Sequence, residues 1–451
     1  MKLYERIYRD LRKDIVDKRL KQGERLPSII ALAKKYDCSK GTVIKALELL
    51  LSQHVIFSKP QSGYYVADNF LRQQHESESI YLDTANPLID SFEIFDIKHC
   101  LNLAVELYAK YAIDESVRLK SLHPVLQQQL AADGVYTKLE NIHLVQGITQ
   151  MLVLFTEAPF PNGKKTILVE EPSYSHYIRF LKLSDVPVLT IARDENGVDL
   201  KQLEHYFKHE DIKFFYTTPR NHNPLGTSYS YKQRKKIMEL ALRYDVYIIE
   251  DDYFGGTHKL PQYVPMYYFS YQKNCIYLRS NTKVFPLIRI GLVVIPDDFK
   301  KTFEEIAGRR TSHYSYYIPS LISQATWEAY ISSAIYEKHI VQKTKQIDEK
   351  LQAVSAVTAD WDNKLVKVIG AESGYYFTLR IHPEIKVKTV IENLKKKDIH
   401  IASNEQAYYH QDHYDNSVRV SVSRVSLEQL QQALRYIYQE VEHLAGRTIP
   451  V

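Results

Sequence analysis

The sequence has few cysteines and no long apolar run, and each absence narrows the class of protein. The 451 residues include 3 cysteines, Cys38, Cys100 and Cys275, which lie far apart without paired spacing. This pattern argues against a disulfide framework or a cysteine-rich zinc site and indicates a reducing compartment. No stretch of about 18 apolar residues occurs, and the first residues alternate charged with apolar side chains rather than forming a signal peptide. The sequence predicts a cytoplasmic protein with no metal site.

Internal repeats and low-complexity tracts are also missing, so repeat and fibrous architectures are not expected. The chain is 45% hydrophobic and 25% charged, which is typical of folded globular proteins. At roughly 150 residues per domain, a chain of this length predicts about three domains.

The basic excess is confined to the first part of the chain. Residues 1–68 hold 14 Lys and Arg against 8 Asp and Glu, whereas the remaining residues hold 45 against 46. A small basic module on a neutral body indicates that the module meets a polyanion while the body has another role. An ordinary solvated surface would explain the six extra charges equally well.

Apolar residues recur at helical spacing in three short segments of this module. The first segment is Leu3 to Leu20. Ser28 is a plausible N-cap of a second short helix, and Ser39 of a third that runs to about Leu51. Two short β-like pieces, 55–59 and 64–66, flank turn residues and predict a hairpin. Three helices and a hairpin form the layout of a winged helix-turn-helix, whose third helix enters the major groove.

The module strongly resembles the GntR-type DNA-binding domain over its whole length. The segments that carry the resemblance are Gly23–Ser28, Leu32–Ala33, Ser39–Val43, Ala46–Leu47 and Ser62–Val66. The resemblance implies six DNA-contacting residues: Ser39, Lys40, Thr42 and Lys45 on the recognition helix, and Ser62 and Gly63 in the wing. Helix capping and surface charge are the alternative roles for these residues. Ile30 departs from the family pattern, because many relatives carry an arginine at this position.

Residues 69–79 are polar and lack apolar periodicity, so we expect a linker between residues 1–68 and the body. Because the linker is short, the two parts can communicate mechanically.

From residue 80 onward, short apolar runs alternate with helical stretches. The runs predicted as strands are 166–170, 187–192, 212–217, 246–250, 275–279 and 290–295. This alternation predicts an α/β fold with a largely parallel sheet in a large part, about 80–319, followed by a small α/β part, about 320–451. Ligands of such sheets bind at the carboxyl ends of the strands.

Three polar segments follow three of these strands: Pro219–Gly226, Glu250–Tyr253 and Ser280–Lys283. Each segment alone is a weak signal. Together and in this order they resemble the pyridoxal-phosphate site of fold-type I aminotransferases, and the resemblance covers about 370 residues. That chemistry needs a lysine for the cofactor aldehyde, a carboxylate for the pyridine nitrogen, and hydroxyls, helix amides and an arginine for the phosphate.

The resemblance assigns a role to each matching residue. It makes Lys283 the aldimine lysine and Asp251 the partner of the pyridine nitrogen, with Asp252 as the alternative. Tyr253 and Asn223 are implied to hydrogen-bond the phenolate oxygen. The remaining implied residues are Gly147, Ile148 and Thr149 in the phosphate turn, the hydroxyls of Ser280 and Thr282, Arg289 for the phosphate, Tyr174 near the cofactor ring, and Arg419 for an effector carboxylate. His176 and His222 are predicted to be ordinary loop residues, with a substrate contact as the alternative.

A GntR-type winged helix joined to an aminotransferase-like body is the architecture of the MocR sub-family of bacterial transcription regulators. The resemblance implies a head-to-tail homodimer that binds operator DNA and senses an amino compound or pyridoxal phosphate itself. One alternative is an active aminotransferase with a fused DNA-binding module. Another is a regulator that has lost the cofactor, which is suggested by Asn281 and by an Arg289 one residue closer to Lys283 than expected.

Overall fold

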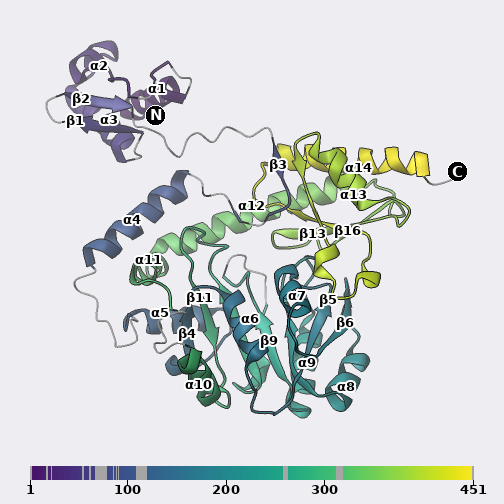
Figure 1. Cartoon of the computed structure of the whole chain (residues 1–451). Helices are drawn as coiled ribbons and strands as arrows, with labels where there is room; N and C mark the ends of the chain where they lie inside the picture. The colour runs from purple at the N-terminus through teal and green to yellow at the C-terminus, as the bar shows by residue number, and fades with distance from the viewer. Residues whose placement is uncertain are drawn as a thin grey trace. The chain divides into compact units, whose positions relative to one another are not determined.

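The computed structural model describes residues 3–16, 19–21, 23–52, 55–59, 62–66, 79–84, 86–87, 89, 91–107, 119–256, 263–310 and 318–448. The chain divides into two compact units, residues 1–78 and 79–451 (Figure 1). All but the last residue of the expected linker, 69–79, lies outside the described residues.

The N-terminal unit is the predicted winged helix. Its elements are α1 (Leu3–Val16), α2 (Ile29–Lys35), α3 (Lys40–Ser52), β1 (Ile56–Lys59) and β2 (Gly63–Val66). The core contains Ile7, Leu32, Val43 and Leu47, which are fully buried, so the apolar faces read from the sequence are the faces that pack. Ser28 caps α2 as expected, since its side chain accepts a hydrogen bond from the amide of Ala31.

The wing is a small antiparallel sheet. β1 pairs with β2 from Ile56↔Val66 to Lys59↔Gly63, and the amide of Leu26 donates to the carbonyl of Tyr64 across 2.8 Å. Gly63 has a φ of +108°, and a Cβ added there would lie 3.3 Å from Nε of Arg25. Both the backbone conformation and the adjacent guanidinium therefore favour glycine at this turn.

The C-terminal unit is built on an eight-stranded sheet. The strand order is β4-β11-β10-β9-β8-β5-β6-β7, and β11 and the short edge strand β7 run antiparallel to their neighbours. The prediction of a largely parallel sheet is therefore confirmed. The strands are β4 (Ile142–Val145), β5 (Thr166–Glu171), β6 (Val188–Asp194), β7 (Gly197–Val198), β8 (Ile212–Thr217), β9 (Tyr247–Asp251), β10 (Cys275–Ser280) and β11 (Gly291–Val294).

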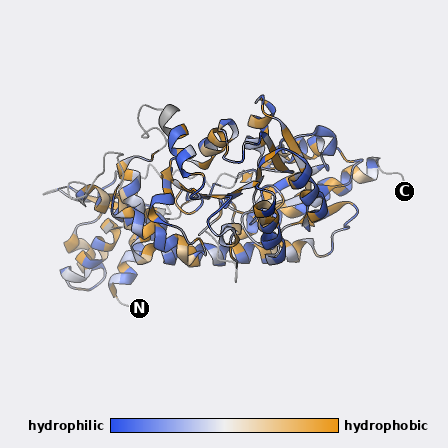
Figure 2. Cartoon of the chain, turned by 90° about the horizontal axis from the view of Figure 1, so that it is seen from below, coloured by the Kyte–Doolittle hydropathy of each residue, from blue (hydrophilic) through white to orange (hydrophobic). Residues whose placement is uncertain are grey.

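Helices cover both faces of this sheet because successive strand side chains point to opposite sides. On one face the ring of Tyr216 of β8 packs edge-on against that of Tyr177, and on the other the ring of Phe215 packs edge-on against that of Phe207. The helices of this part are α4 (Ser91–Leu107), α5 (Leu122–Ala132), α6 (Ile148–Glu157), α7 (Ser175–Lys182), α8 (Leu200–His209), α9 (Tyr231–Arg243), α10 (Lys300–Arg310) and α11 (Leu321–Ile331). Figure 2 shows apolar and polar residues side by side on the helices, as amphipathic packing requires.

The small part follows the long helix α12 (Ala334–Thr358), which packs against α11 and α14 (Figure 1). Its main sheet is antiparallel, in the order β12-β13-β16-β15. The elements are β12 (Val366–Ile369), β13 (Tyr376–Ile381), α13 (Val387–Lys395), β14 (Ile399–His400), β15 (Ala402–Ser403), β16 (Ser417–Ser421) and α14 (Leu427–Thr448). Strand β3 (Ile80–Tyr81) pairs with β14, so the first residues after the expected linker lie against the small part and not against the large sheet.

None of the helices in the described part of the chain combines the length and the apolar character that crossing a membrane requires.

Candidate functional site

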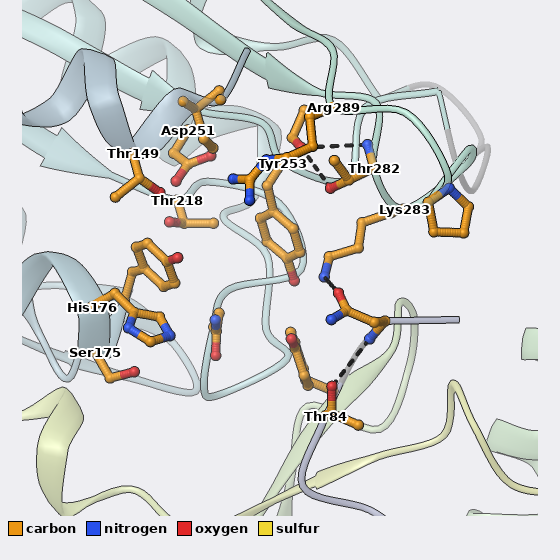
Figure 3. Close-up of a pocket in the computed structure, with 18 of the residues that line it drawn as sticks. Thr84, Thr149, Ser175, His176, Thr218, Asp251, Tyr253, Thr282, Lys283 and Arg289 are labelled. Atoms are coloured by element: carbon orange, nitrogen blue, oxygen red, sulfur yellow. Dashed lines mark hydrogen bonds between the residues drawn. The ribbon is translucent and has the colours of Figure 1, made fainter. Parts of the chain in front are cut away.

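A cavity of about 690 Å³ lies where the strands of the large sheet end and α6 begins. The structure brings the sequence-predicted site residues together here from segments far apart in the chain (Figure 3). All twelve residues predicted to contact cofactor or effector line it: Gly147, Ile148, Thr149, Tyr174, Asn223, Asp251, Tyr253, Ser280, Thr282, Lys283, Arg289 and Arg419.

Lys283 lies in the turn after β10, and its side chain extends across the cavity (Figure 3). Its Nζ donates a hydrogen bond of 3.4 Å to Oδ1 of Asn86. Burial of the ammonium group, together with the positive charge of Arg419, lowers the pKa of Lys283 to about 8. An appreciable fraction of this lysine is therefore a neutral, nucleophilic amine near neutral pH.

The two neighbouring aspartates have different surroundings. Asp251 lines the cavity, and its Oδ2 accepts a hydrogen bond of 2.6 Å from the hydroxyl of Tyr216. Asp252 is outside the cavity lining, because its carboxylate pairs with Arg220 through two bonds of 2.9 and 2.6 Å and accepts a third from Tyr277. Of the two carboxylates, Asp251 is therefore the one available to a ligand.

The carboxylate of Asp251 also has an unused oxygen. Oδ1 is buried and has no hydrogen-bond partner among the described residues. Burial raises the pKa of Asp251 to about 7, although the hydrogen bond from Tyr216 opposes this shift. A buried acceptor without a partner is costly, so this atom is suited to receive a proton-bearing group of a ligand.

Another set of residues in the cavity lining consists of groups that bind anions. Gly147 is the N-cap of α6, whose first backbone amides have no partner within the helix. A Cβ at Gly147 would lie 3.3 Å from a guanidinium nitrogen of Arg289, so a larger residue would crowd this cation. The hydroxyls of Ser280 and Thr282 lie 2.9 Å apart at the same edge. Helix amides, hydroxyls and a guanidinium together form a site for a phosphate-sized anion.

Three other predicted ligand contacts, Tyr253, Asn223 and Arg419, form hydrogen bonds within the protein in this structure. The hydroxyl of Tyr253 donates to the carbonyl of Asn221 across 2.6 Å. Arg419 donates from Nη1 to Oδ1 of Asn223, at 3.0 Å, and from Nη2 to the carbonyl of Asp83, at 2.7 Å. A carboxylate that bound Arg419 would compete with both acceptors.

Sequence reasoning missed eight residues that line the cavity: Asp83, Thr84, Asn86, Gln146, Ser175, Thr218, Pro286 and Tyr376. Thr218 directly follows β8, so the rule that ligands bind at strand ends could have found it. His176 was predicted to be an ordinary loop residue, and the cavity lining favours the alternative of a ligand contact. Asp83, Thr84 and Asn86 carry no local signal, because they precede the first strand of the large sheet.

A buried ionic network lies beneath the site. Glu170 of β5 accepts hydrogen bonds from Arg193, at 2.5 Å, and from the backbone amide of Thr218, at 3.0 Å. His222 lies 3.3 Å from the same carboxylate, and the side chains of all three ionisable residues are fully buried. Burial would raise the pKa of Glu170, but the charge of Arg193 and the contacts of His222 and Tyr229 hold it well below its usual range. His222 is therefore a support beneath the site and not a surface residue.

In the N-terminal unit, most of the predicted DNA contacts also have local partners. The Oγ of Ser39 accepts from the amide of Thr42, at 3.2 Å, as an N-cap does, and Lys40 is exposed. The Nζ of Lys45 lies 4.8 Å from the centre of the Tyr4 ring, and Ser62 hydrogen-bonds the hydroxyl of Tyr65 across 2.7 Å. Ile30, the departure from the family pattern, is 65% exposed.

Comparisons with known proteins agree with this architecture. Residues 3–66 match the family described as bacterial regulatory proteins, gntR family, and residues 120–437 match aminotransferase class I and II. The HTH-type transcriptional regulator YcxD of Bacillus subtilis is 32% identical over 92% of this chain and 94% of its own. The chain belongs to this family of gntR-type regulators with an aminotransferase domain. NorG of Staphylococcus aureus, another HTH-type transcriptional regulator, is 25% identical over 93% of the chain and 99% of its own.

Solved structures show the fold of the C-terminal unit. The multiple substrate aminotransferase of Thermococcus profundus superposes with a TM-score of 0.72 at 22% identity, over 85% of this chain and 97% of its own. LysN of Thermus thermophilus, an α-aminoadipate aminotransferase complexed with N-(5'-phosphopyridoxyl)-L-leucine, has a TM-score of 0.70 at 17% identity, over 83% and 95%. The predicted aminotransferase-like fold is confirmed in this regulator.

Proposed function

We propose that this protein is a DNA-binding transcriptional regulator whose C-terminal unit binds pyridoxal phosphate together with an amino compound, and that occupancy of this site controls operator binding. The observation that carries the proposal is the convergence of twelve sequence-predicted residues on one cavity in a chain that begins with a gntR-type winged helix. The homodimer expected from the aminotransferase-like fold is part of the proposal, because a symmetric dimer presents two winged helices to two half-sites.

The residues present fit pyridoxal phosphate. When bound, this cofactor supplies an aldehyde that condenses with primary amines and a ring that withdraws electrons. The Oδ1 of Asp251, which has no hydrogen-bond partner in the described part of the chain, is suited to hold the proton of the pyridine nitrogen. Arg289 and the N-terminal amides of α6 are suited to bind the phosphate, and Lys283 lies within the same cavity with a lowered pKa.

The effector would be an amino compound that carries a carboxylate. Arg419 lies at the cavity wall with its guanidinium 4.5 Å from the centre of the Tyr376 ring, which fixes the plane of the fork. A planar guanidinium binds a carboxylate through two parallel hydrogen bonds, which are stronger than its bonds to the neutral acceptors of Asn223 and Asp83. A bound carboxylate would therefore replace the hydrogen bonds that Arg419 donates to Asn223 and to the carbonyl of Asp83.

An active aminotransferase is the second candidate, because the same cavity holds Lys283 as a partly neutral amine and the carboxyl group of Asp251. Turnover of an amino donor and a keto acid at a steady rate would favour this candidate. It leaves the winged helix without a role.

The proposal is tested by the affinity of the full-length protein for its operator with and without pyridoxal phosphate. Coupling between two sites typically changes affinity by about 5- to 150-fold, so we expect a change of at least fivefold. Fluorescence anisotropy of labelled operator DNA measures this ratio, and an unrelated duplex serves as the control. A visible absorbance change on addition of pyridoxal phosphate, with identical operator affinities, would contradict the regulatory part of the proposal.

The DNA-binding surface is tested by Lys40→Ala combined with Lys45→Ala. If both ammonium groups contact phosphates, operator binding weakens by roughly tenfold or more, and the slope of log K against log salt falls by about 2. Anisotropy titrations at several salt concentrations measure both quantities.

Lys301→Ala combined with Lys345→Ala is the matched control, because both of these lysines are exposed on helices of the C-terminal unit. Unchanged affinity and slope in the Lys40/Lys45 variant would rule out α3 as the DNA-contacting helix.

A further inference from the structure

The first described residues of the C-terminal unit are hydrogen-bonded to its small part. We name residues 79–84 and 86 the junction segment, because in the chain they directly follow the residues that lead from the winged helix. The amide of Ile80 donates to the carbonyl of Asp398, at 2.7 Å, and the amide of Leu82 donates to the carbonyl of His400, at 2.8 Å. The carbonyl of Leu82 in turn accepts from the amide of Ser421, at 2.8 Å. The segment is therefore held between β14 and β16.

The next residues of the junction segment enter the cavity. The carbonyl of Asp83 accepts from Nη2 of Arg419 across 2.7 Å, and Oδ1 of Asn86 accepts from Nζ of Lys283 across 3.4 Å. Figure 3 shows the Lys283 side chain extended toward the stretch that carries Thr84. Lys283 and Arg419, the two cations predicted to bind the ligand, thus hydrogen-bond the junction segment, which is continuous in sequence with the winged helix.

The junction segment is also anchored outside the cavity lining, where the ring of Tyr81 stacks on that of His400 at 4.7 Å between centroids. The Oγ of Ser423 donates to the carbonyl of Thr84 across 2.9 Å. Ser423 follows β16 and lies four residues after Arg419. The guanidinium of Arg419 and the hydroxyl of Ser423 therefore donate hydrogen bonds to the adjacent carbonyls of Asp83 and Thr84.

We propose that the junction segment is the ligand-responsive element of this protein: a ligand that engages Lys283 or Arg419 displaces Asn86 and the Asp83 carbonyl from these cations, and the segment shifts. The inference rests on the proposed function. A ligand can change a conformational equilibrium only through contacts that differ between the two states, and the bonds to Asp83 and Asn86 are such contacts. Because the backbone is continuous from residue 79 to the winged helix, a shift here acts directly on the tether of the DNA-binding unit.

Hydrogen exchange measures the shift directly in the full-length protein. With pyridoxal phosphate as the probe, we expect the amides of Ile80 and Leu82 to exchange at least about fivefold faster, because their bonds to the small part are loosened. A peptide that covers β13 serves as the internal control. Unchanged protection of residues 79–84 in protein that binds pyridoxal phosphate would overturn the inference.

A matched pair of variants tests the link to DNA. Ser423→Ala removes an anchor of the junction segment without altering the cavity lining. We expect its operator affinity without ligand to move at least threefold toward that of the liganded wild type, and its response to pyridoxal phosphate to shrink by a similar factor. Asn102→Ala, an exposed position on α4, should behave as wild type. Wild-type operator affinity and response in Ser423→Ala would overturn the inference.

The hydrogen-exchange and operator-affinity measurements together distinguish failure of this inference from failure of the proposed function. If pyridoxal phosphate gives neither an absorbance change nor a change in operator affinity, the proposed function fails, and the ligand-free affinity of Ser423→Ala still decides whether the junction segment controls DNA binding. If pyridoxal phosphate changes operator affinity while exchange at residues 79–84 stays constant, only the junction segment is excluded.

Discussion

Replacing Lys283 with alanine is expected to abolish covalent capture of pyridoxal phosphate. This amine lines the same cavity as Asp251 and Arg289, and its pKa of about 8 leaves roughly a tenth of it neutral at pH 7. An ordinary lysine, with a pKa of about 10.4, is neutral to well under one part in a thousand at that pH. Treatment with borohydride followed by mass spectrometry of the intact protein is expected to show one adduct on the wild type and none on Lys283→Ala.

A lowered pKa alone does not make a lysine react with pyridoxal phosphate, because the lysine must also lie in the cavity. Lys350 provides a control that separates these two requirements. Burial also lowers the pKa of Lys350 to about 8, but its Nζ donates to the carbonyl of Val422 and lies outside the cavity lining. Lys350→Met is therefore expected to retain the adduct. An adduct of equal yield on Lys283→Ala would contradict the assignment of Lys283.

Capture is also expected to depend on pH in a direction set by the same pKa. Because the lowered pKa of Lys283 places its deprotonation near pH 8, the neutral fraction rises from about 10% at pH 7 to about 90% at pH 9. The initial rate of the absorbance change should therefore rise nearly tenfold over this interval.

The candidate site could be assembled from the sequence because its chemistry follows strand ends. β8, β9 and β10 are neighbours in the sheet, and the register pairs Thr217 with Glu250 and Asp251 with Leu278. The residues that follow each strand therefore meet at one edge, although Asn223 and Lys283 are far apart in the chain. Strand periodicity placed these segments at one edge of the sheet, and the resemblance to fold-type I aminotransferases indicated which of their residues form the site. The roles of these residues in binding a ligand stay a prediction.

The choice between Asp251 and Asp252 could not be made from the sequence. Successive residues of a strand point to opposite faces, and both faces of this sheet are buried, so hydropathy does not identify the face that borders the cavity. In the structure Asp252 pairs with the long-range partners Arg220 and Tyr277, whereas Asp251 lines the cavity.

The junction segment was missed for a related reason. Its bonds to Lys283 and Arg419 join residues separated by 197 and 336 positions, and such contacts leave no periodic pattern. A strand of two residues, such as β3, is also too short to produce an alternation. The contacts of the junction segment can therefore be identified from the structure but not from the sequence.

Breaking the ionic network beneath the site is expected to lower the stability of the C-terminal unit. Glu170 and Arg193 are fully buried side chains, and Glu170 also binds the amide of Thr218, which lines the cavity. Removing one member of a buried ion pair leaves the other charge without compensation, which costs about 3–5 kcal/mol. Glu170→Gln keeps the size of the side chain, so its effect isolates the charge.

The expected result for Glu170→Gln is a fall of about 1 M or more in the urea midpoint, if the denaturant slope is about 3 kcal/mol per molar. Tryptophan fluorescence reports this unit, because Trp327 and Trp361 are the two tryptophans of the chain. The variant should also capture pyridoxal phosphate more weakly, since the carboxylate fixes the loop of Thr218.

Glu195→Gln is the matched control, because it breaks a pair with Lys367 whose side chains are 33% and 45% exposed. A surface pair contributes at most about 1 kcal/mol, so this variant should unfold near the wild-type midpoint. Adding Arg193→Met to Glu170→Gln removes both buried charges and should recover part of the lost stability. Equal midpoints for Glu170→Gln and Glu195→Gln would show that the buried charge of Arg193 is compensated by another group, and that the network does not support the site.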